Sequence, residues 1–183
     1  MRKPMIALGL VALLTAALAV PVAAAPPDTA GAKRPTIVSR AVEINAQTGE
    51  FSTLLSLATQ YPDIVAALSG KQQLTLFAPT DQAFADLFAF LGTLGVDPGD
   101  LTADQIKTVL LYHVTPGRWS GDRLAGQSGI TMLSGESASV SAAGGVAINS
   151  ANVVIADVPA SNGFIHAIDA VLVPPSILAA LGL

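Results

Sequence analysis

The 183-residue sequence contains no cysteine, only two histidines and a single tryptophan. A chain without cysteine has no disulfide framework, so its fold depends on a hydrophobic core. Two histidines cannot assemble a His- or Cys-rich zinc site, and the H-E-x-x-H motif of metalloproteases is absent. We therefore expect the protein to fold without a metal ion or a redox cofactor.

The sequence also lacks the motifs of hydrolases and nucleotide-binding enzymes. The segment Ser134–Ser139 has no second glycine to complete a G-x-S-x-G nucleophile elbow. Gly144-Gly145 is not followed by the Lys-Ser/Thr pair of a phosphate-binding loop. The carboxylates are scattered, and no two can be argued to face each other across a sugar cleft. These absences predict a non-catalytic protein with no nucleotide cofactor.

Basic residues are few and do not cluster. Nine lysines and arginines stand against 13 aspartates and glutamates, which gives a formal net charge of −4. Binding to nucleic acid or to anionic lipid requires clustered basic residues, so neither is an expected partner. Aromatic residues make up 5% of the chain, which disfavours a large stacking surface for carbohydrate.

The first residues have the three-part layout of a secretory signal peptide. Arg2-Lys3 gives a positive start, Met5–Val20 carries no charge, and Pro21–Ala25 supplies small residues in an A-x-A-like order. We place cleavage after Ala24, because cleavage one residue later would leave Pro26 at the new N-terminus, where its fixed φ and missing N–H make a poor substrate. The protein is therefore expected to be secreted or otherwise extracytoplasmic.

An uncleaved membrane anchor is the alternative, although the apolar run is shorter than the ~20 residues of a spanning helix. Contact with a membrane is expected only through such an uncleaved leader. Cleavage removes residues 1–24 and with them two of the nine basic residues and no acidic one, so the net charge changes from −4 to −6. Residues 25–36 are rich in Ala and Pro and predict a flexible linker, and residues 37–183 then form a single domain.

Apolar periodicity predicts helices in the first part of this domain and strands in the rest. The predicted helices cover residues 49–61, 64–70 and 81–90, and a fourth is capped by Thr102 and ends near His113. The predicted strands are Leu74–Ala78, Ile130–Met132, Ala138–Val140, Val146–Ile148, Val153–Ile155, Phe164–Ile168 and Val171–Val173. Helices followed by antiparallel hairpins are typical of the α+β class.

Three segments carry a family resemblance. Thr75–Phe84 reads TLFAPTDQAF, Leu110–Val114 reads LLYHV, and Asn162–Pro175 reads NGFIHAIDAVLVPP. In their order and in their amino-acid sequences, they resemble the first box, the Tyr-His motif and the second box of the fasciclin (FAS1) domain. The resemblance covers about Ile37 to Leu178.

The resemblance implies an α+β fold, a β-sandwich or wedge of short antiparallel strands flanked by several helices that lie mainly in the N-terminal half. It implies a non-catalytic extracellular module used in adhesion, whose partner is an extracellular protein or polysaccharide. The alternative is an extracytoplasmic carrier of an apolar small molecule, a pigment or a lipid.

The first two motifs supply four candidate interaction residues. Thr80 is a predicted N-cap, and Asp81 can accept backbone N–H bonds at the start of its own helix or reach a nearby donor. The resemblance links Tyr112 and His113 to receptor binding as well as to packing against the two boxes. The apolar residues beside them favour packing.

The second box supplies the other candidates. Asn162 and Gly163 form a strong turn signal. His166 shares its side of the strand with two apolar residues, so it is expected to be at least partly buried and to need a hydrogen-bond partner: a backbone carbonyl, Asp81 or Asp169. Asp169, which follows the strand, is itself a candidate interaction residue. We expect one hydrophobic core, which has to satisfy Asp81, His113 and His166. Its expected members are Leu76, Phe77, Phe84, Leu111, Tyr112, Ile165 and Ile168.

Overall fold

The computed structural model describes residues 34–97, 99 and 101–182 of the chain. The predicted signal peptide 1–24, its cleavage after Ala24 and the linker as far as residue 33 lie outside these residues. Within the described ranges, no helix is both long enough and apolar enough to cross a membrane.

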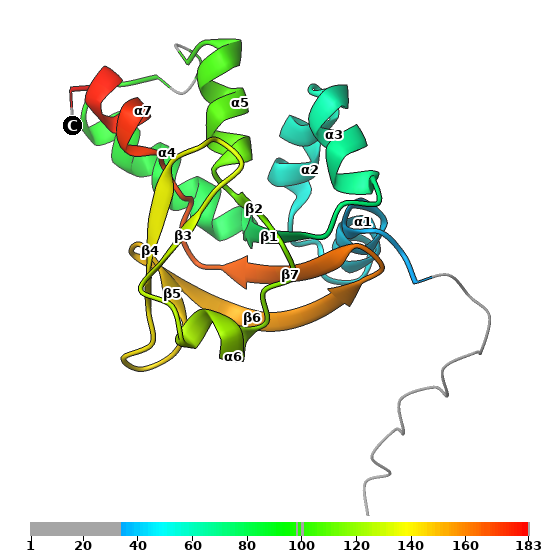
Figure 1. Cartoon of the computed structure of the whole chain (residues 1–183). Coiled ribbons are helices and arrows are strands. Elements are labelled where there is room, and N and C mark those ends of the chain that lie inside the picture. Colours follow the sequence, from blue (N-terminus) through cyan, green and yellow to red (C-terminus); the bar gives the residue numbers. More distant parts are fainter. Residues whose placement is uncertain (1–33, 98, 100, 183) are drawn as a thin grey trace, which may run out of the picture. The chain divides into compact units, whose positions relative to one another are not determined.

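Most helices precede most strands along the chain (Figure 1). The helices are α1 (Ile37–Thr48), α2 (Ser52–Thr59), α3 (Pro62–Ser69), α4 (Asp81–Thr93), α5 (Ala103–Leu111), α6 (Gly121–Ala125) and α7 (Pro175–Ala180). Four of them, α2 to α5, lie where the periodicity predicts helices. Thr102 and Gln105 form a capping box at the start of α5, where each side chain bonds the backbone of the other.

Helices α1, α6 and α7 are not among the predicted helices. In α1 the buried Ile37 and Ala41 and the partly buried Ile44 recur at helical spacing, so this pattern could have predicted the helix. The other two span five and six residues, which is less than two turns and too short to show a period.

The strands form one seven-stranded sheet in the order β2-β1-β7-β6-β5-β4-β3. They are β1 (Leu74–Pro79), β2 (Val114–Pro116), β3 (Gly129–Thr131), β4 (Ser137–Ser141), β5 (Ala147–Ile148), β6 (Ala151–Ala160) and β7 (Gly163–Ile168). Neighbouring strands are antiparallel, as expected, except that β1 and β7 are parallel. This pair brings the first and second boxes side by side, and the α+β class is confirmed.

The two edge strands of the sheet approach each other. The Leu133 N–H donates to the Val114 carbonyl (2.7 Å), and the Thr115 hydroxyl donates to the Thr131 carbonyl (2.8 Å). The sheet therefore curls strongly, as Figure 1 shows, without a ladder that would close it into a barrel.

The predicted strand Val171–Val173 is wrong. The segment pairs with no strand, and the Leu172 N–H instead donates to Nε2 of His113 (2.9 Å). Pro174 follows directly and has no N–H with which to extend a ladder.

Buried side chains form two clusters instead of the one core expected from the sequence. Alternate residues of β1 and β7 point to opposite faces of the sheet. Leu76 and Ile165 pack with the helices in the first cluster, whereas Phe77 and Ile168 pack with β3, β4 and β5 in the second. The boxes thus occupy the layer between two cores.

Candidate functional site

Thr80 and Asp81 lie at the start of α4 and connect it to α2. The Thr80 hydroxyl accepts a hydrogen bond from the Ala83 N–H (3.2 Å). The Asp81 carboxylate accepts from the N–H groups of Ser52 (3.1 Å) and Thr53 (2.8 Å), the first residues of α2. Of its two expected options, Asp81 thus reaches a nearby donor. Partial burial disfavours its ionised form, but these hydrogen bonds outweigh burial and hold the pKa of Asp81 below its ordinary value.

Tyr112 follows α5 directly and is fully buried. Its hydroxyl donates to the Ser137 carbonyl (2.9 Å) and accepts from the Asn149 side-chain amide (3.1 Å). It therefore connects the end of α5 to β4 and to the turn that follows β5.

His113 is 1% exposed, and both of its ring nitrogens are bonded to backbone groups. Nδ1 donates to the Val109 carbonyl (2.7 Å), and Nε2 accepts from the Leu172 N–H, so the ring is neutral. Burial lowers the pKa of His113 to about 4, and the hydrogen bond to Val109 opposes only part of that effect. The ring holds the segment after β7 against α5.

Asn162 lies in the turn between β6 and β7 and is 4% exposed. Its Oδ1 accepts from the Ile37 N–H (2.9 Å), and its Nδ2 donates to the carbonyls of Leu68 (2.7 Å) and Gly70 (3.1 Å). One side chain therefore joins the start of α1 and the end of α3 to the sheet.

Gly163 opens β7 at the point where this strand lies closest to β1. A Cβ atom at Gly163 would lie 1.6 Å from the carbonyl oxygen of Leu74. The predicted turn is present, but the backbone of β1 is what requires a glycine here.

His166 is fully buried in β7, as its position in the strand predicts. Its Nε2 donates to the Trp119 carbonyl (2.8 Å), and its Nδ1 accepts from the Asp157 N–H (3.2 Å). Of the three expected partners, the structure selects a backbone carbonyl. Burial lowers the pKa of His166, against the opposing effects of the Trp119 hydrogen bond and the Asp157 charge. Asp169 is exposed, and its carboxylate accepts from the backbone and side-chain N–H groups of Asn152 (2.7 and 2.8 Å).

The candidate residues from the motifs do not form a shared site. In the part of the chain that the structure describes, none of them is hydrogen-bonded to another, and no group of three or more acidic or histidine side chains could hold a metal. Apart from Thr80, whose side chain caps its own helix, and Gly163, which has no side chain, each one joins separate segments of the chain.

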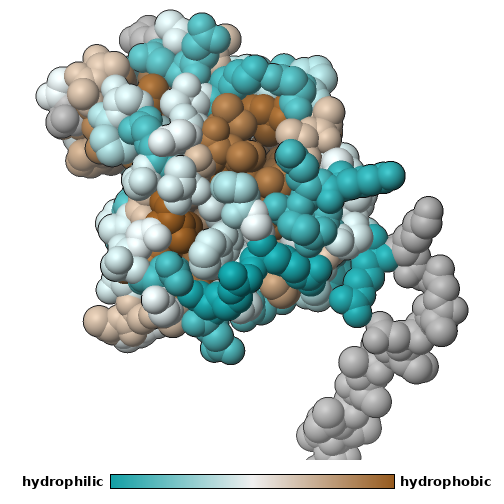
Figure 2. Space-filling model, in the orientation of Figure 1, coloured by the Kyte–Doolittle hydropathy of each residue, from teal (hydrophilic) through white to brown (hydrophobic). Residues whose placement is uncertain are grey.

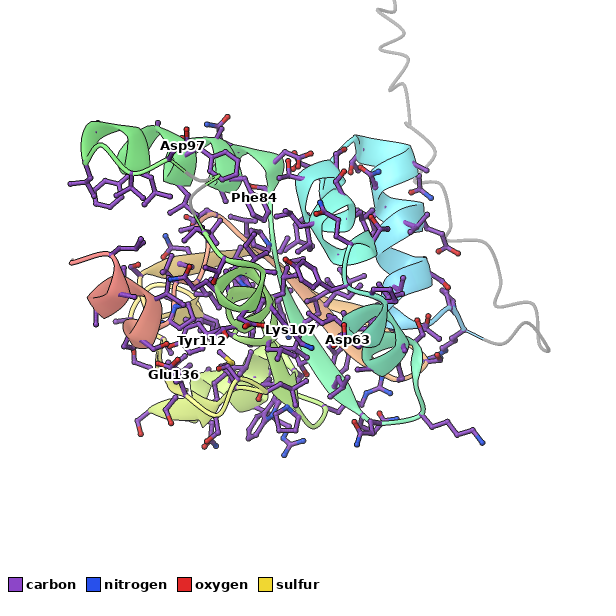
Figure 3. All side chains as sticks on the ribbon, turned by 90° about the horizontal axis from the view of Figure 1, so that it is seen from above. Asp63, Phe84, Asp97, Lys107, Tyr112 and Glu136 are labelled. Atoms are coloured by element: carbon purple, nitrogen blue, oxygen red, sulfur yellow. The ribbon has the colours of Figure 1, made fainter. Side chains whose placement is uncertain are left out.

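The structure does contain an apolar pocket of about 310 Å³ between α2, α4, α5 and α7. Its described lining is Leu54, Leu57, Phe84, Leu87, Phe88, Phe90, Leu91, Gly99, Leu101, Ile106, Val109, Leu110, His113, Val171, Val173, Ile177, Leu178 and Leu181. Figure 3 shows Phe84 projecting from α4 toward α5. His113 supplies the one ionisable side chain in this lining.

A second pocket, of about 120 Å³, lies on the other side of α5, toward α1 and α3. It shares Leu54, Leu110 and His113 with the larger pocket. Figure 2 shows a brown patch between α5 and the α2–α3 pair, where this smaller pocket lies.

Sequence reasoning missed the larger pocket, although the apolar residues of α4 indicate it. Phe88 and Phe90 both line the pocket and lie at the two edges of an apolar face of α4 that is broader than a single stripe. An amphipathic surface helix needs one apolar stripe, and additional apolar residues indicate a further apolar contact or cavity.

Replacing Asn162 with alanine should lower the free energy of unfolding by about 3 kcal/mol. The change leaves the Ile37 N–H and the carbonyls of Leu68 and Gly70 buried without their partner. Urea unfolding at pH 7 measures the effect. The matched control is Asn152→Ala, which removes one exposed hydrogen bond, from the Asn152 side-chain amide to Asp169, keeps the backbone bond to the same carboxylate, and should cost about 1 kcal/mol or less. Equal, small losses in both variants would contradict the structural role of Asn162.

Comparison with known proteins agrees with the motifs and the fold. A family model described as Fasciclin domain matches residues 49–174. The chain is 42% identical to Protein sll1483 of Synechocystis sp., over 73% of each protein, and 33% identical to the uncharacterized protein sll1735 of the same organism, over 72% of this chain and 95% of that protein. It is 29% identical to the transforming growth factor-beta-induced protein ig-h3 of Oryctolagus cuniculus, over 68% of this chain and 18% of that protein.

A solved structure shares the fold. It is a FAS1 domain pair from the insect cell adhesion molecule fasciclin I, with a TM-score of 0.59 and 19% identity. The match covers 80% of this chain and 53% of that structure, so this chain spans about half of the domain pair. The expected fasciclin-like fold is thereby confirmed. With the family model matching most of the domain, the chain belongs to the fasciclin domain family.

Proposed function

We propose that the chain is an exported, non-catalytic interaction module that binds an extracellular protein through the apolar surface of α4. The observation that carries this proposal is the exposure of large apolar side chains there: Phe88 is 40% exposed, Phe90 54% and Leu94, which caps the helix, 43%. Apolar groups gathered at a surface are typical of protein-binding sites.

The comparisons support adhesion as the setting. The solved structure of the same fold comes from a cell adhesion molecule. The non-catalytic role is supported by the histidines, because backbone groups occupy both ring nitrogens of His113 and of His166 and leave neither free as a general base.

Binding of beads coated with residues 25–183 to the surface of the producing cells tests this function. Binding should be saturable, and prior protease treatment of the cells should abolish it. The double variant Phe88→Ser/Phe90→Ser should bind weakly, because it removes apolar contact area. The matched control is Val154→Ser/Ile155→Ser, two residues of β6 that are each 54% exposed. Undiminished binding by the α4 variant would contradict the proposed surface, and binding that survives protease would indicate a polysaccharide partner.

The pocket of about 310 Å³ favours a second function, carriage of an apolar small molecule. A carried molecule should be present in an organic extract of protein purified without detergent, where absorbance and mass spectrometry would detect it.

A further inference from the structure

The larger pocket is closed at its inner end and accessible beside α4. Leu54, Phe84 and Leu110, which line it, are buried. Phe88 and Phe90 line it too, yet both are exposed, so they stand where the pocket meets solvent. A ligand can therefore have one end inside and the other in water.

The polarity of the lining restricts the chemistry of the part of a ligand that lies inside the pocket. Among the lining residues that the structure describes, His113 alone has an ionisable side chain, and the Val109 carbonyl and the Leu172 N–H occupy its two ring nitrogens. A polar head group placed inside would lose its water without gaining a hydrogen-bond partner, at a substantial cost in free energy. The inner end of the ligand must therefore be apolar, and its polar end must stay at the Phe88–Phe90 rim.

The volume sets the length of the buried part. A cavity of ~150 Å³ lined by Leu, Ile and Phe accepts one benzene molecule. A pocket of about 310 Å³ is twice that size and accommodates about 12 carbon atoms. A long polyene pigment would extend far beyond this space, whereas one alkyl chain of medium length fills it.

We propose that this pocket binds the apolar tail of a single-chain lipid, with about 12 carbons enclosed and the polar head at the rim formed by Phe88 and Phe90. The inference rests on the carrier function proposed above and specifies its ligand. It names a lipid tail rather than a pigment.

Chain length provides the first test. N-phenylnaphthylamine, an uncharged fluorescent probe, is bound to the mature protein and displaced by straight-chain alcohols of increasing length. Affinity should rise about fourfold for each added methylene group and then level off near 12 carbons. A rise that continues at the same rate to about 16 carbons, or failure of the probe to bind, would overturn the proposal.

A substitution that fills the pocket provides the second test. Val109→Phe adds a ring to the lining on α5 and should weaken dodecanol binding about tenfold or more, because it displaces several methylene groups. The matched control is Val154→Phe, which adds the same ring on β6, away from the pocket, and should bind dodecanol like the wild type. Thermal unfolding of both variants verifies that they are folded, and Leu87→Trp replaces Val109→Phe if that variant fails to fold. Equal affinities in the filled and control variants would overturn the site.

The outcomes separate this inference from the carrier function. If native protein yields an extractable apolar molecule that Val109→Phe still retains, carriage stands and the site is wrong. If the native protein yields no such molecule, but dodecanol binding shows the predicted limit and is lost in Val109→Phe, the site stands and carriage does not. If the probe is excluded because two copies of the chain cover the pocket, the molecular mass in solution will reveal a dimer and the lipid site is wrong.

Discussion

Replacing Gly163 with alanine should prevent the chain from holding its native fold. The new Cβ would lie 1.6 Å from the Leu74 carbonyl oxygen and 2.8 Å from its carbon, and both are backbone atoms that no side-chain rotation can move. Either β1 or β7 must shift, and with them the parallel ladder that joins the two boxes. We expect a loss of about 5 kcal/mol or more, which is comparable to the whole stability of a small domain.

Urea unfolding and the yield of folded monomer measure this loss. The matched control is Gly92→Ala, in which the new methyl group points into open space on α4. Alanine stabilises a helix relative to glycine, so this control should gain up to about 1 kcal/mol. A Gly163→Ala protein that unfolds at the same urea concentration as the wild type would show that the close approach of β1 does not require glycine.

Gly163 also illustrates how far sequence reasoning reaches. An Asn-Gly pair predicts a tight turn, and the turn is there, because turn geometry is a local property. The contact with Leu74 depends on the pairing of strands almost 90 residues apart along the chain, which no local pattern encodes. The same limit applies to His166: the alternation of β7 predicts its burial, whereas its partner, the Trp119 carbonyl, lies 47 residues away.

The pocket could not be predicted for a related reason. Capping and periodicity predict α2, α4 and α5 one at a time, because each depends on residues within a few turns. An empty volume between helices depends on how they pack, and a lining residue such as Leu110 has the same pattern as a core residue. The sequence identifies the motif residues, but it does not show which segments they contact. Asp81, for example, could be recognised as a helix-capping residue, but not as one that bonds the start of α2.

Acidification from pH 7 to pH 4 should destabilise the folded protein by about 3 kcal/mol through His113 alone. In the unfolded chain its pKa is 6.5, whereas burial lowers it to about 4 in the native state. Between these values the unfolded chain binds a proton that the folded chain does not, so stability falls as the pH falls. The contribution is fully present above pH 6.5 and fully lost below pH 4. His166, whose pKa is also lowered, acts in the same direction.

Asp81 does not account for a change in this range, because its pKa lies below 3.8 in the folded protein and its contribution is lost only at lower pH. The free energy of unfolding in urea, measured in steps from pH 7 to pH 4, should therefore decline by about 1.4 kcal/mol per pH unit for each histidine that titrates.

The test variant is His113→Gln, whose Oε1 offers the Leu172 N–H an acceptor but binds no proton. It should be less stable at pH 7, because the Val109 carbonyl loses its donor, yet its decline should be shallower by about 1.4 kcal/mol per pH unit. Parallel curves for the variant and the wild type would show that His113 does not sense acid in the folded protein.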